Sequence, residues 1–283
     1  MLSSVQETID ERAQAFYRHA LRNLNEAEVD YLVGGAYALA RHTGVARHTK
    51  DIDIFVRERD LERVLSVLEM NGCCTEITYP HWLGKARCGE ELMDVIYGSG
   101  NGVVMVDDEW FEHALPDEIL GQRVLLSPIE EMIWSKAFIM ERERYDGADV
   151  LHLLHAQALE LDWPRLLRRF DGHYRVLFAH LVLFGFVYPS QRATIPKPVM
   201  EHLLRRLRLE LDSPPPEVRV CQGTLLSRAQ FLVDLERFGY EDARHEPGVH
   251  MTDAHIAQWT DAIAEELRTY GCTARDHTPG RSR

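Results

Sequence analysis

Two aspartates separated by one residue, Asp51 and Asp53, are the strongest sign of chemistry in the sequence. In an extended strand both side chains lie on one face, while Ile52, Ile54 and Val56 lie on the other. Neighbouring carboxylates repel each other, so a protein keeps such a pair mainly where a cation neutralises it. Mg²⁺ prefers oxygen ligands, commonly one or two carboxylates together with substrate phosphates. The pair therefore predicts a magnesium site that handles phosphates, the alternative being a solvated strand edge with two incidental aspartates.

The elements just before this pair are those that would bring a phosphate to it. Residues 31–33 form a short apolar run that predicts a strand, and Gly34 and Gly35 follow it directly. Two glycines allow a tight turn and a close approach of a ligand to the backbone. Residues 36–41 then begin a helix, and the free N–H groups at its start can hold a phosphate.

Together these features resemble the nucleotidyltransferase superfamily, which includes DNA polymerase β, CCA-adding enzymes and aminoglycoside nucleotidyltransferases. The resemblance rests on Gly34-Gly35, a spacer of 15 residues, and Asp51-Ile52-Asp53. It covers residues 28–140 approximately. The run Arg47-His-Thr-Lys-Asp-Ile-Asp is also similar to many uncharacterised bacterial members, and other features loosely resemble AbiEii-type toxins. The fold class that this resemblance implies is α/β (α+β), with a small mixed sheet, flanking helices and a C-terminal helical region.

A third carboxylate is expected from a later strand, because members of the family use one there. Asp94 interrupts the otherwise apolar run at residues 92–97. An isolated carboxylate in a buried strand is costly unless it is paired or binds a cation, which favours placing Asp94 beside Asp51 and Asp53. A half-exposed strand that turns Asp94 to solvent is the alternative. Glu90 and Glu91 compete for the role but are expected in the turn.

The sequence Ser127-Pro-Ile-Glu130 predicts a helix start, with a capping box and proline at the first helical position. We expect this helix to reach about Glu143 and place a domain boundary at its start. The predicted parts are a catalytic domain at 1–126, a helical domain at 127–270, and a disordered tail at 271–283.

Several basic residues are candidates for neutralising a triphosphate. In related enzymes a helix of the second domain brings a basic residue there, and Lys136 is the candidate by resemblance, with a plain surface lysine as the alternative. Arg47 and Lys50 lie in the loop before Asp51 and could serve the same purpose. Arg142 and Arg144 are weaker candidates.

Charge patterns bear on what accepts the transferred group. The formal net charge of −13 disfavours a protein whose whole surface grips nucleic acid. The acidic cluster Asp107–Glu109 could hold a cationic substrate, although a solvated loop is the plainer interpretation. Residues 161–212 carry nine Lys or Arg against five Asp or Glu, and this helical region is where a tRNA could dock. Amphipathic helices normally carry charge on their wet faces, which is the alternative explanation.

Composition places the chain among ordinary globular proteins. Hydrophobic residues make up 45% of 283 residues, enough for one large core or two. Five cysteines without Cys-x-x-Cys spacing predict free thiols in a reduced, cytoplasmic protein, and no signal peptide is visible. The longest apolar run, 176–188, is too short to span a membrane and predicts a buried helix.

The predicted activity is a nucleotidyltransferase that moves an NMP from an NTP such as ATP to an acceptor hydroxyl. As the resemblance implies, Asp51 and Asp53 hold two Mg²⁺ ions, and Asp94 completes one site and takes the hydroxyl proton. Gly34 and Gly35 cradle phosphate. A small-molecule acceptor is slightly favoured. The alternatives are a toxin-like tRNA nucleotidyltransferase and a non-catalytic nucleotide-binding or antitoxin-like module. The sequence leaves the oligomeric state open.

Overall fold

The computed structural model describes residues 11–46, 49 and 51–273, and the side chains of those up to residue 263. The predicted phosphate contacts Arg47 and Lys50 lie outside the described residues, as does the end of the predicted tail.

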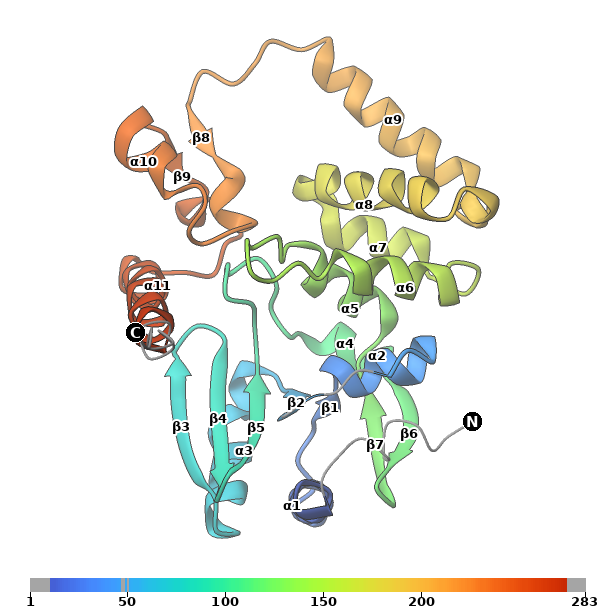
Figure 1. Ribbon diagram of the computed structural model, residues 1–283. Coiled ribbons are helices and arrows are strands. Elements are labelled where there is room, and N and C mark those ends of the chain that lie inside the picture. The colour runs from blue at the N-terminus through green and yellow to red at the C-terminus, as the bar shows by residue number, and fades with distance from the viewer. Residues whose placement is uncertain (1–10, 47–48, 50, 274–283) are drawn as a thin grey trace, which may run out of the picture.

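A mixed seven-stranded sheet forms the lower half of the molecule (Figure 1). The strands lie in the order β3-β4-β5-β2-β1-β7-β6. Their bounds are Leu32–Val33 for β1, Asp51–Phe55 for β2, Cys74–Tyr79 for β3, Leu83–Cys88 for β4, Glu91–Ile96 for β5, Leu115–Ile119 for β6 and Gln122–Leu126 for β7. Strand β2 is central and runs parallel to β5 and antiparallel to β1. The α/β fold class predicted from the sequence is confirmed.

Alternation along β2 and β5 gives the sheet one apolar and one polar face. Ile52, Ile54, Met93 and Val95 are fully buried. Helices α1 (Glu11–Glu26) and α3 (Leu61–Met70) cover this apolar face and pack against each other. The intervening residues of both strands therefore lie on the opposite face.

The opposite side of the sheet is covered by helices. Helix α2 (Gly35–Thr43) lies between β2 and a layer formed by five further helices (Figure 1). These are α5 (Ile129–Ala137), α6 (Gly147–Gln157), α7 (Trp163–Phe170), α8 (Tyr174–Val187) and α9 (Lys197–Leu211), and α4 (Asp108–Glu112) is a short connecting helix. Short 3-10 turns occur at Glu58–Asp60, Asp171–His173, Pro189–Thr194, Gln222–Leu225 and Ala243–His245.

Helix α5 differs from its prediction at both ends. The buried Ser127 hydroxyl makes no hydrogen bond to a described residue, so the expected capping box does not form. Glu130 instead accepts from the backbone N–H of Asp162 and binds Arg165. The helix ends at Ala137, six residues before the expected Glu143, where the chain turns back in a short bridge between Met140 and Tyr145. The domain boundary proposed at residue 127 falls between β7 and α5 and stays a proposal.

The C-terminal segment returns from the helical layer to the sheet. It contains β8 (Val220–Cys221), α10 (Leu232–Phe238), β9 (Glu241–Asp242) and α11 (Asp253–Thr273) in that order, and β8 pairs with β9 in parallel. The amide of Asn101 donates to Leu225 O at 2.7 Å, and Met140 N–H donates to Leu226 O at 3.1 Å. The backbone at Leu225 and Leu226 thus joins the loop after β5 to the loop after α5.

An aromatic cluster fixes α11 to the tip of the β3–β4 hairpin. The ring of Trp259 packs edge-on against Tyr79 and Trp82, with centroids 4.8 and 5.5 Å apart. The Gln258 amide donates to Thr78 O at 3.1 Å. Arg228 lies over the outer side of Trp259, 4.5 Å from its centroid.

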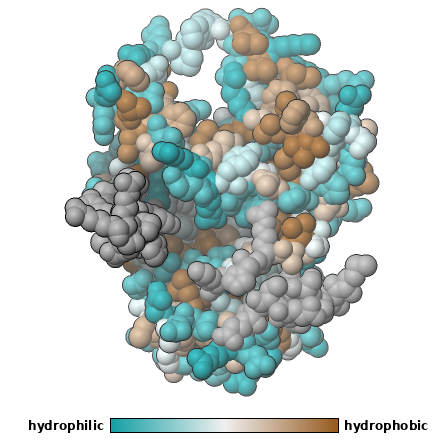
Figure 2. Space-filling view, viewed as in Figure 1, coloured by the Kyte–Doolittle hydropathy of each residue, from teal (hydrophilic) through white to brown (hydrophobic). Residues whose placement is uncertain are grey.

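Two further expectations need correction. Cys73 and Cys88 are joined by a disulfide across the base of the β3–β4 hairpin, with Cα atoms 4.6 Å apart, so the prediction of free thiols is wrong for this pair. The two are distant in sequence, and only the hairpin register brings them together. The apolar run at 176–188 forms α8, but it is buried on one side only, since Phe186 is 82% exposed. Hydrophobic residues accordingly appear on the surface over the helical layer, at the upper right of Figure 2. Among the described helices, none is both long and apolar enough to cross a bilayer.

Candidate active site

The polar face of the central strands brings the three predicted aspartates together. In the parallel register of β2 and β5, Asp53 lies directly opposite Asp94, and Asp51 lies two residues before Asp53 on the same face. The hydroxyl of Thr49 donates to Asp51 Oδ1 at 2.6 Å. Asp94 therefore does not turn to solvent, and its carboxylate shares the face predicted for it.

Crowding of these carboxylates changes their acidity. Burial, with the nearby charges of Asp51 and Asp94, raises the pKa of Asp53 from 3.8 to about 7, although Lys136 and Arg144 oppose the shift. Burial also raises the pKa of Asp94, against the opposing charge of Lys85. The site thus holds more negative charge than the described residues neutralise, which is a favourable setting for a divalent cation.

This excess charge has a consequence for stability in the absence of metal. A folded-state pKa above the unfolded value makes the native state bind more protons, so the free energy of unfolding falls as pH rises from about 4 to about 7. The Asp53→Asn variant lacks this loss. In EDTA, we expect the free energy of unfolding of the variant, relative to that of the wild type, to rise by roughly 2 to 4 kcal/mol between pH 5 and pH 8, as measured by urea unfolding. A difference that does not change with pH would contradict the shift.

The two glycines are required by the side chains of β2. Gly35 begins α2 with φ +53°, and a Cβ there would lie 1.6 Å from Asp53 Oδ2. A Cβ on Gly34 would lie 2.2 Å from the ring of Phe55. The carboxylate of Asp53 therefore sits against the first turn of α2, where free N–H groups favour negative charge. A phosphate cradle at these glycines stays a prediction.

Gly35→Ala is expected to harm both stability and activity. The positive φ costs about 1 to 2 kcal/mol for alanine, and the new methyl must displace the Asp53 carboxylate. Gly44→Ala is the matched control, because Gly44 has φ +75° at the other end of α2 and an added Cβ would touch nothing within 4 Å. We expect Gly44→Ala to lose only the stability that the positive φ costs, Gly35→Ala to lose more, and only Gly35→Ala to lose at least about tenfold in nucleotidyl transfer. Equal activity in the two would show that the clash is harmless.

Two basic residues approach the carboxylates from the helical layer. Lys136 Nζ contacts Asp146 at 3.1 Å and Asp149 at 2.9 Å, and its side chain is mostly buried. Arg144 also binds Asp146, with two hydrogen bonds of 3.1 Å. Asp146 therefore binds both cations, and its side chain makes no capping hydrogen bond to α6. Lys136 is not the free surface lysine of the alternative interpretation.

Oxygen donors at the site suit Mg²⁺, although they do not enclose it. Within residues 11–46, 49 and 51–273, no three His, Cys, Asp or Glu side chains are arranged as a metal-binding group. Magnesium usually keeps several waters and takes its remaining ligands from substrate phosphates, so a closed protein cage is not needed. Asp51 and Asp53 would supply the carboxylates.

One residue that the sequence did not single out lies beside Asp94. Lys85 on β4 faces Asp94 in the antiparallel register and contacts its Oδ1 at 3.3 Å. The only signal for Lys85 in the sequence was its place in a strand next to the one carrying Asp94.

Ion pairs within this chain occupy the acidic cluster and part of the basic region suggested for an acceptor. Arg169 contacts Asp107 at 2.5 Å and Glu109 at 3.1 Å, and Arg168 contacts Glu109 at 2.6 Å. Arg165 is buried against Glu130 and Glu131. The acidic cluster is therefore not free for a cationic substrate, and much of the expected basic patch is not free for tRNA.

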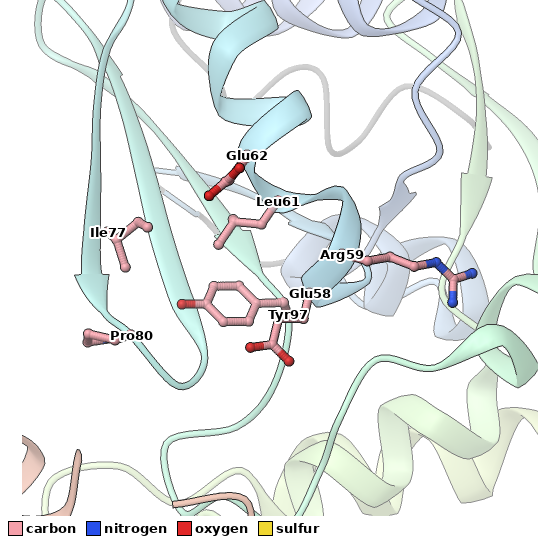
Figure 3. A pocket seen from close by; sticks show the side chains of 7 residues that line it. All are labelled: Glu58, Arg59, Leu61, Glu62, Ile77, Pro80 and Tyr97. Atoms are coloured by element: carbon pink, nitrogen blue, oxygen red, sulfur yellow. The ribbon is translucent and has the colours of Figure 1, made fainter. Parts of the chain in front are cut away.

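A pocket lies beside α3 and the turn before it (Figure 3). Its volume is about 410 Å³, and Tyr97, Ile77 and Pro80 line it together with residues of α3 and the turn before it. Tyr97 is three residues beyond Asp94 on the continuation of β5, so it points to the opposite face. The pocket is therefore separate from the candidate active site.

Comparison with known proteins bears on this geometry. Residues 18–87 match the family model described as aminoglycoside-2''-adenylyltransferase, a span that includes β1, the two glycines and both aspartates of β2. The predicted resemblance to nucleotidyltransferases is confirmed. The match also agrees with the predicted enzyme class and with NMP transfer to a hydroxyl of a small molecule. The matched region stops before β5, so the role proposed for Asp94 rests on the strand register.

A curated protein from Treponema pallidum (strain Nichols), named D-lactate dehydrogenase, is 28% identical over 117 residues. The match covers 39% of this chain and 34% of that protein, so the chain spans about a third of the length of this relative. The Gly-x-Gly-x-x-Gly fingerprint of dinucleotide-binding dehydrogenases is absent from the sequence.

Solved nucleotidyltransferases give weak structural likenesses. The antibiotic-resistance factor ANT(2'')-Ia is 19% identical with a TM-score of 0.43, covering 61% of this chain and 98% of its own. An antigenic nucleotidyltransferase-like protein from Paracoccidioides brasiliensis is 16% identical with a TM-score of 0.43, covering 65% and 91%. The lincosamide adenylyltransferase LnuA is 16% identical with a TM-score of 0.36, covering 52% and 97%.

Proposed function

We propose that this protein transfers an NMP, with ATP as the donor of first choice, to a hydroxyl of a small-molecule acceptor. The observation that carries the proposal is the placement of Asp53 opposite Asp94, beside Asp51 and the first turn of α2, within a region that matches a nucleotidyltransferase family. The family description makes aminoglycosides the first acceptors to test.

Each of these residues would have a separate role in the reaction. Asp51 and Asp53 would hold the cation-bound triphosphate, and Lys136 and Arg144 would stabilise the charge on the departing pyrophosphate. Asp94, whose pKa burial raises, would accept the proton as the acceptor oxygen attacks the α-phosphorus. Two Mg²⁺ ions at these carboxylates would stabilise both the attacking and the leaving oxygen. Phosphate binding at Gly34 and Gly35, and at Arg47 and Lys50, belongs to the same proposal.

A small acceptor is favoured over tRNA by the ion pairs of the helical layer. Arg165, Arg168 and Arg169 each bind a carboxylate of this chain, so they do not offer the unpaired row of cations that a polyanion needs. We also propose a cytoplasmic location, since the donor is an NTP, although the Cys73–Cys88 disulfide favours an oxidising compartment.

The test uses nucleotides labelled at different phosphates. The protein is incubated with Mg²⁺, each α-labelled NTP, and in turn a panel of aminoglycosides, a lincosamide and bulk tRNA. Label in a small-molecule product whose mass increases by one NMP supports the proposal. Transfer from γ-labelled but not α-labelled ATP would show phosphoryl transfer instead, and labelled tRNA would support the toxin-like alternative. No transfer to any acceptor, with nucleotide still bound, would favour a non-catalytic module.

A further inference from the structure

A row of charged residues crosses three strands on the polar face of the sheet. Lys85 on β4 lies opposite Asp94 on β5, and Asp94 lies opposite Asp53 on β2. Their side chains share one face because residues in register point the same way. The ammonium of Lys85 is 3.3 Å from Asp94 Oδ1, and these side chains are 24% and 16% exposed.

Lys85 differs from the other cations near the site in the partner it binds. Lys136 and Arg144 make their ion pairs with Asp146 and Asp149. Among the residues that the structure describes, Lys85 alone pairs with one of the three aspartates. Asp94 Oδ1 is buried and makes no hydrogen bond to a described residue. The contact with Lys85 therefore offsets the cost of burying this charged oxygen.

We propose that Lys85 is a positioning residue that holds Asp94 in the metal-free protein and competes with a divalent cation for Asp94 Oδ1. A carboxylate that is buried among like charges is costly without a counter-charge. Lys85 supplies that charge, but an ammonium and a divalent cation on the same oxygen repel each other. Lys85 therefore stabilises the empty site and withdraws from Asp94 when a cation binds. This inference rests on the proposed function, because that function assigns a cation to these carboxylates.

The test is binding of Mn²⁺ to the full chain, measured by the loss of the free-ion electron paramagnetic resonance signal. Lys85→Met removes the competing charge, and we expect its Mn²⁺ dissociation constant to fall roughly tenfold. Its melting temperature without metal should also fall below that of the wild type. Lys85→Arg keeps the charge and should bind Mn²⁺ as the wild type does.

Arg87→Met is the matched control. Arg87 lies two residues beyond Lys85 on β4, on the same face and opposite Leu92. Its replacement by methionine removes one positive charge from the same strand. We expect its Mn²⁺ affinity to stay within about twofold of wild type, since a more distant and exposed charge is screened by solvent. Equal tightening by both variants would reduce the effect to net charge and overturn the inference.

The outcomes also separate this inference from the proposed function. If the wild type binds Mn²⁺, Asp53→Asn abolishes binding and Lys85→Met leaves the affinity unchanged or weaker, the cation site stands and the role of Lys85 is wrong. If the wild type binds no Mn²⁺ with or without ATP, both the proposed cation site and the role of Lys85 fail.

Discussion

Asp53→Asn is expected to lower the rate of NMP transfer by at least about a hundredfold, because several kcal/mol of the barrier depend on charge held at this position. Asp53 is central to the site: it lies between Asp51 and Asp94, and its carboxylate touches the backbone at Gly35. Asparagine has nearly the same shape, so it keeps the packing and removes the charge. The measurement is initial rate of α-label transfer at saturating Mg²⁺.

Stability gives this variant an internal control. Because burial raises the pKa of Asp53 to about 7, removing its charge should leave the metal-free protein as stable as the wild type or more stable at pH 8. Lost activity in a protein that melts no lower than the wild type therefore points to chemistry and not to misfolding. Asp30→Asn, at an exposed position in the turn before β1, should transfer label normally. An Asp53→Asn protein with wild-type rates would remove the proposed mechanism.

Arg165→Met is expected to cost about 3 to 5 kcal/mol of stability, because it leaves two carboxylates buried without their partner. Arg165 joins α7 to α5 through Glu130 and Glu131, and all three side chains are at most 7% exposed. Glu131 keeps Arg169, but Glu130 keeps only the backbone N–H of Asp162. In a domain of this size the melting temperature should fall by roughly 10 °C.

Two further variants test the reason for that loss. Arg168→Met, on the same helix, removes an arginine whose side chain is 63% exposed and whose partner Glu109 also binds Arg169, so it should cost less than about 1 kcal/mol. Adding Glu130→Gln and Glu131→Gln to Arg165→Met removes the stranded charges and should recover a large part of the stability. A triple variant no more stable than Arg165→Met would show that packing, not charge, explains the cost.

Local patterns in the sequence were sufficient for the central part of this fold. The two-residue period of Asp51, Ile52, Asp53 and Ile54 determines which side chains enter the core, and the structure has the isoleucines fully buried. Asp94 was found in the same way, because a charge in an apolar run needs a reason. Such patterns predict structure correctly where the sequence of a single strand determines both which side chains are buried and which carry the chemistry.

Features that depend on pairing between separate segments of the chain could not be predicted from local sequence patterns. Lys85 meets Asp94, and Cys73 meets Cys88, only through the register of a hairpin. Ser127 and Glu130 have the sequence of a capping box at a helix start. Glu130 instead binds Arg165, thirty-five residues later, and the box does not form. A local rule fails where a long-range ion pair competes for the same side chain.

The docking of α11 on the β3–β4 hairpin also bears on when the molecule can finish folding. Tyr79 and Trp82 stack on each other within the hairpin tip, but they leave the ribosome long before Trp259, whose ring packs edge-on against both. Domains fold as they are synthesised, but contacts of such wide sequence separation must wait. The hairpin that carries Lys85 therefore gains its last support only when almost the whole chain has been translated.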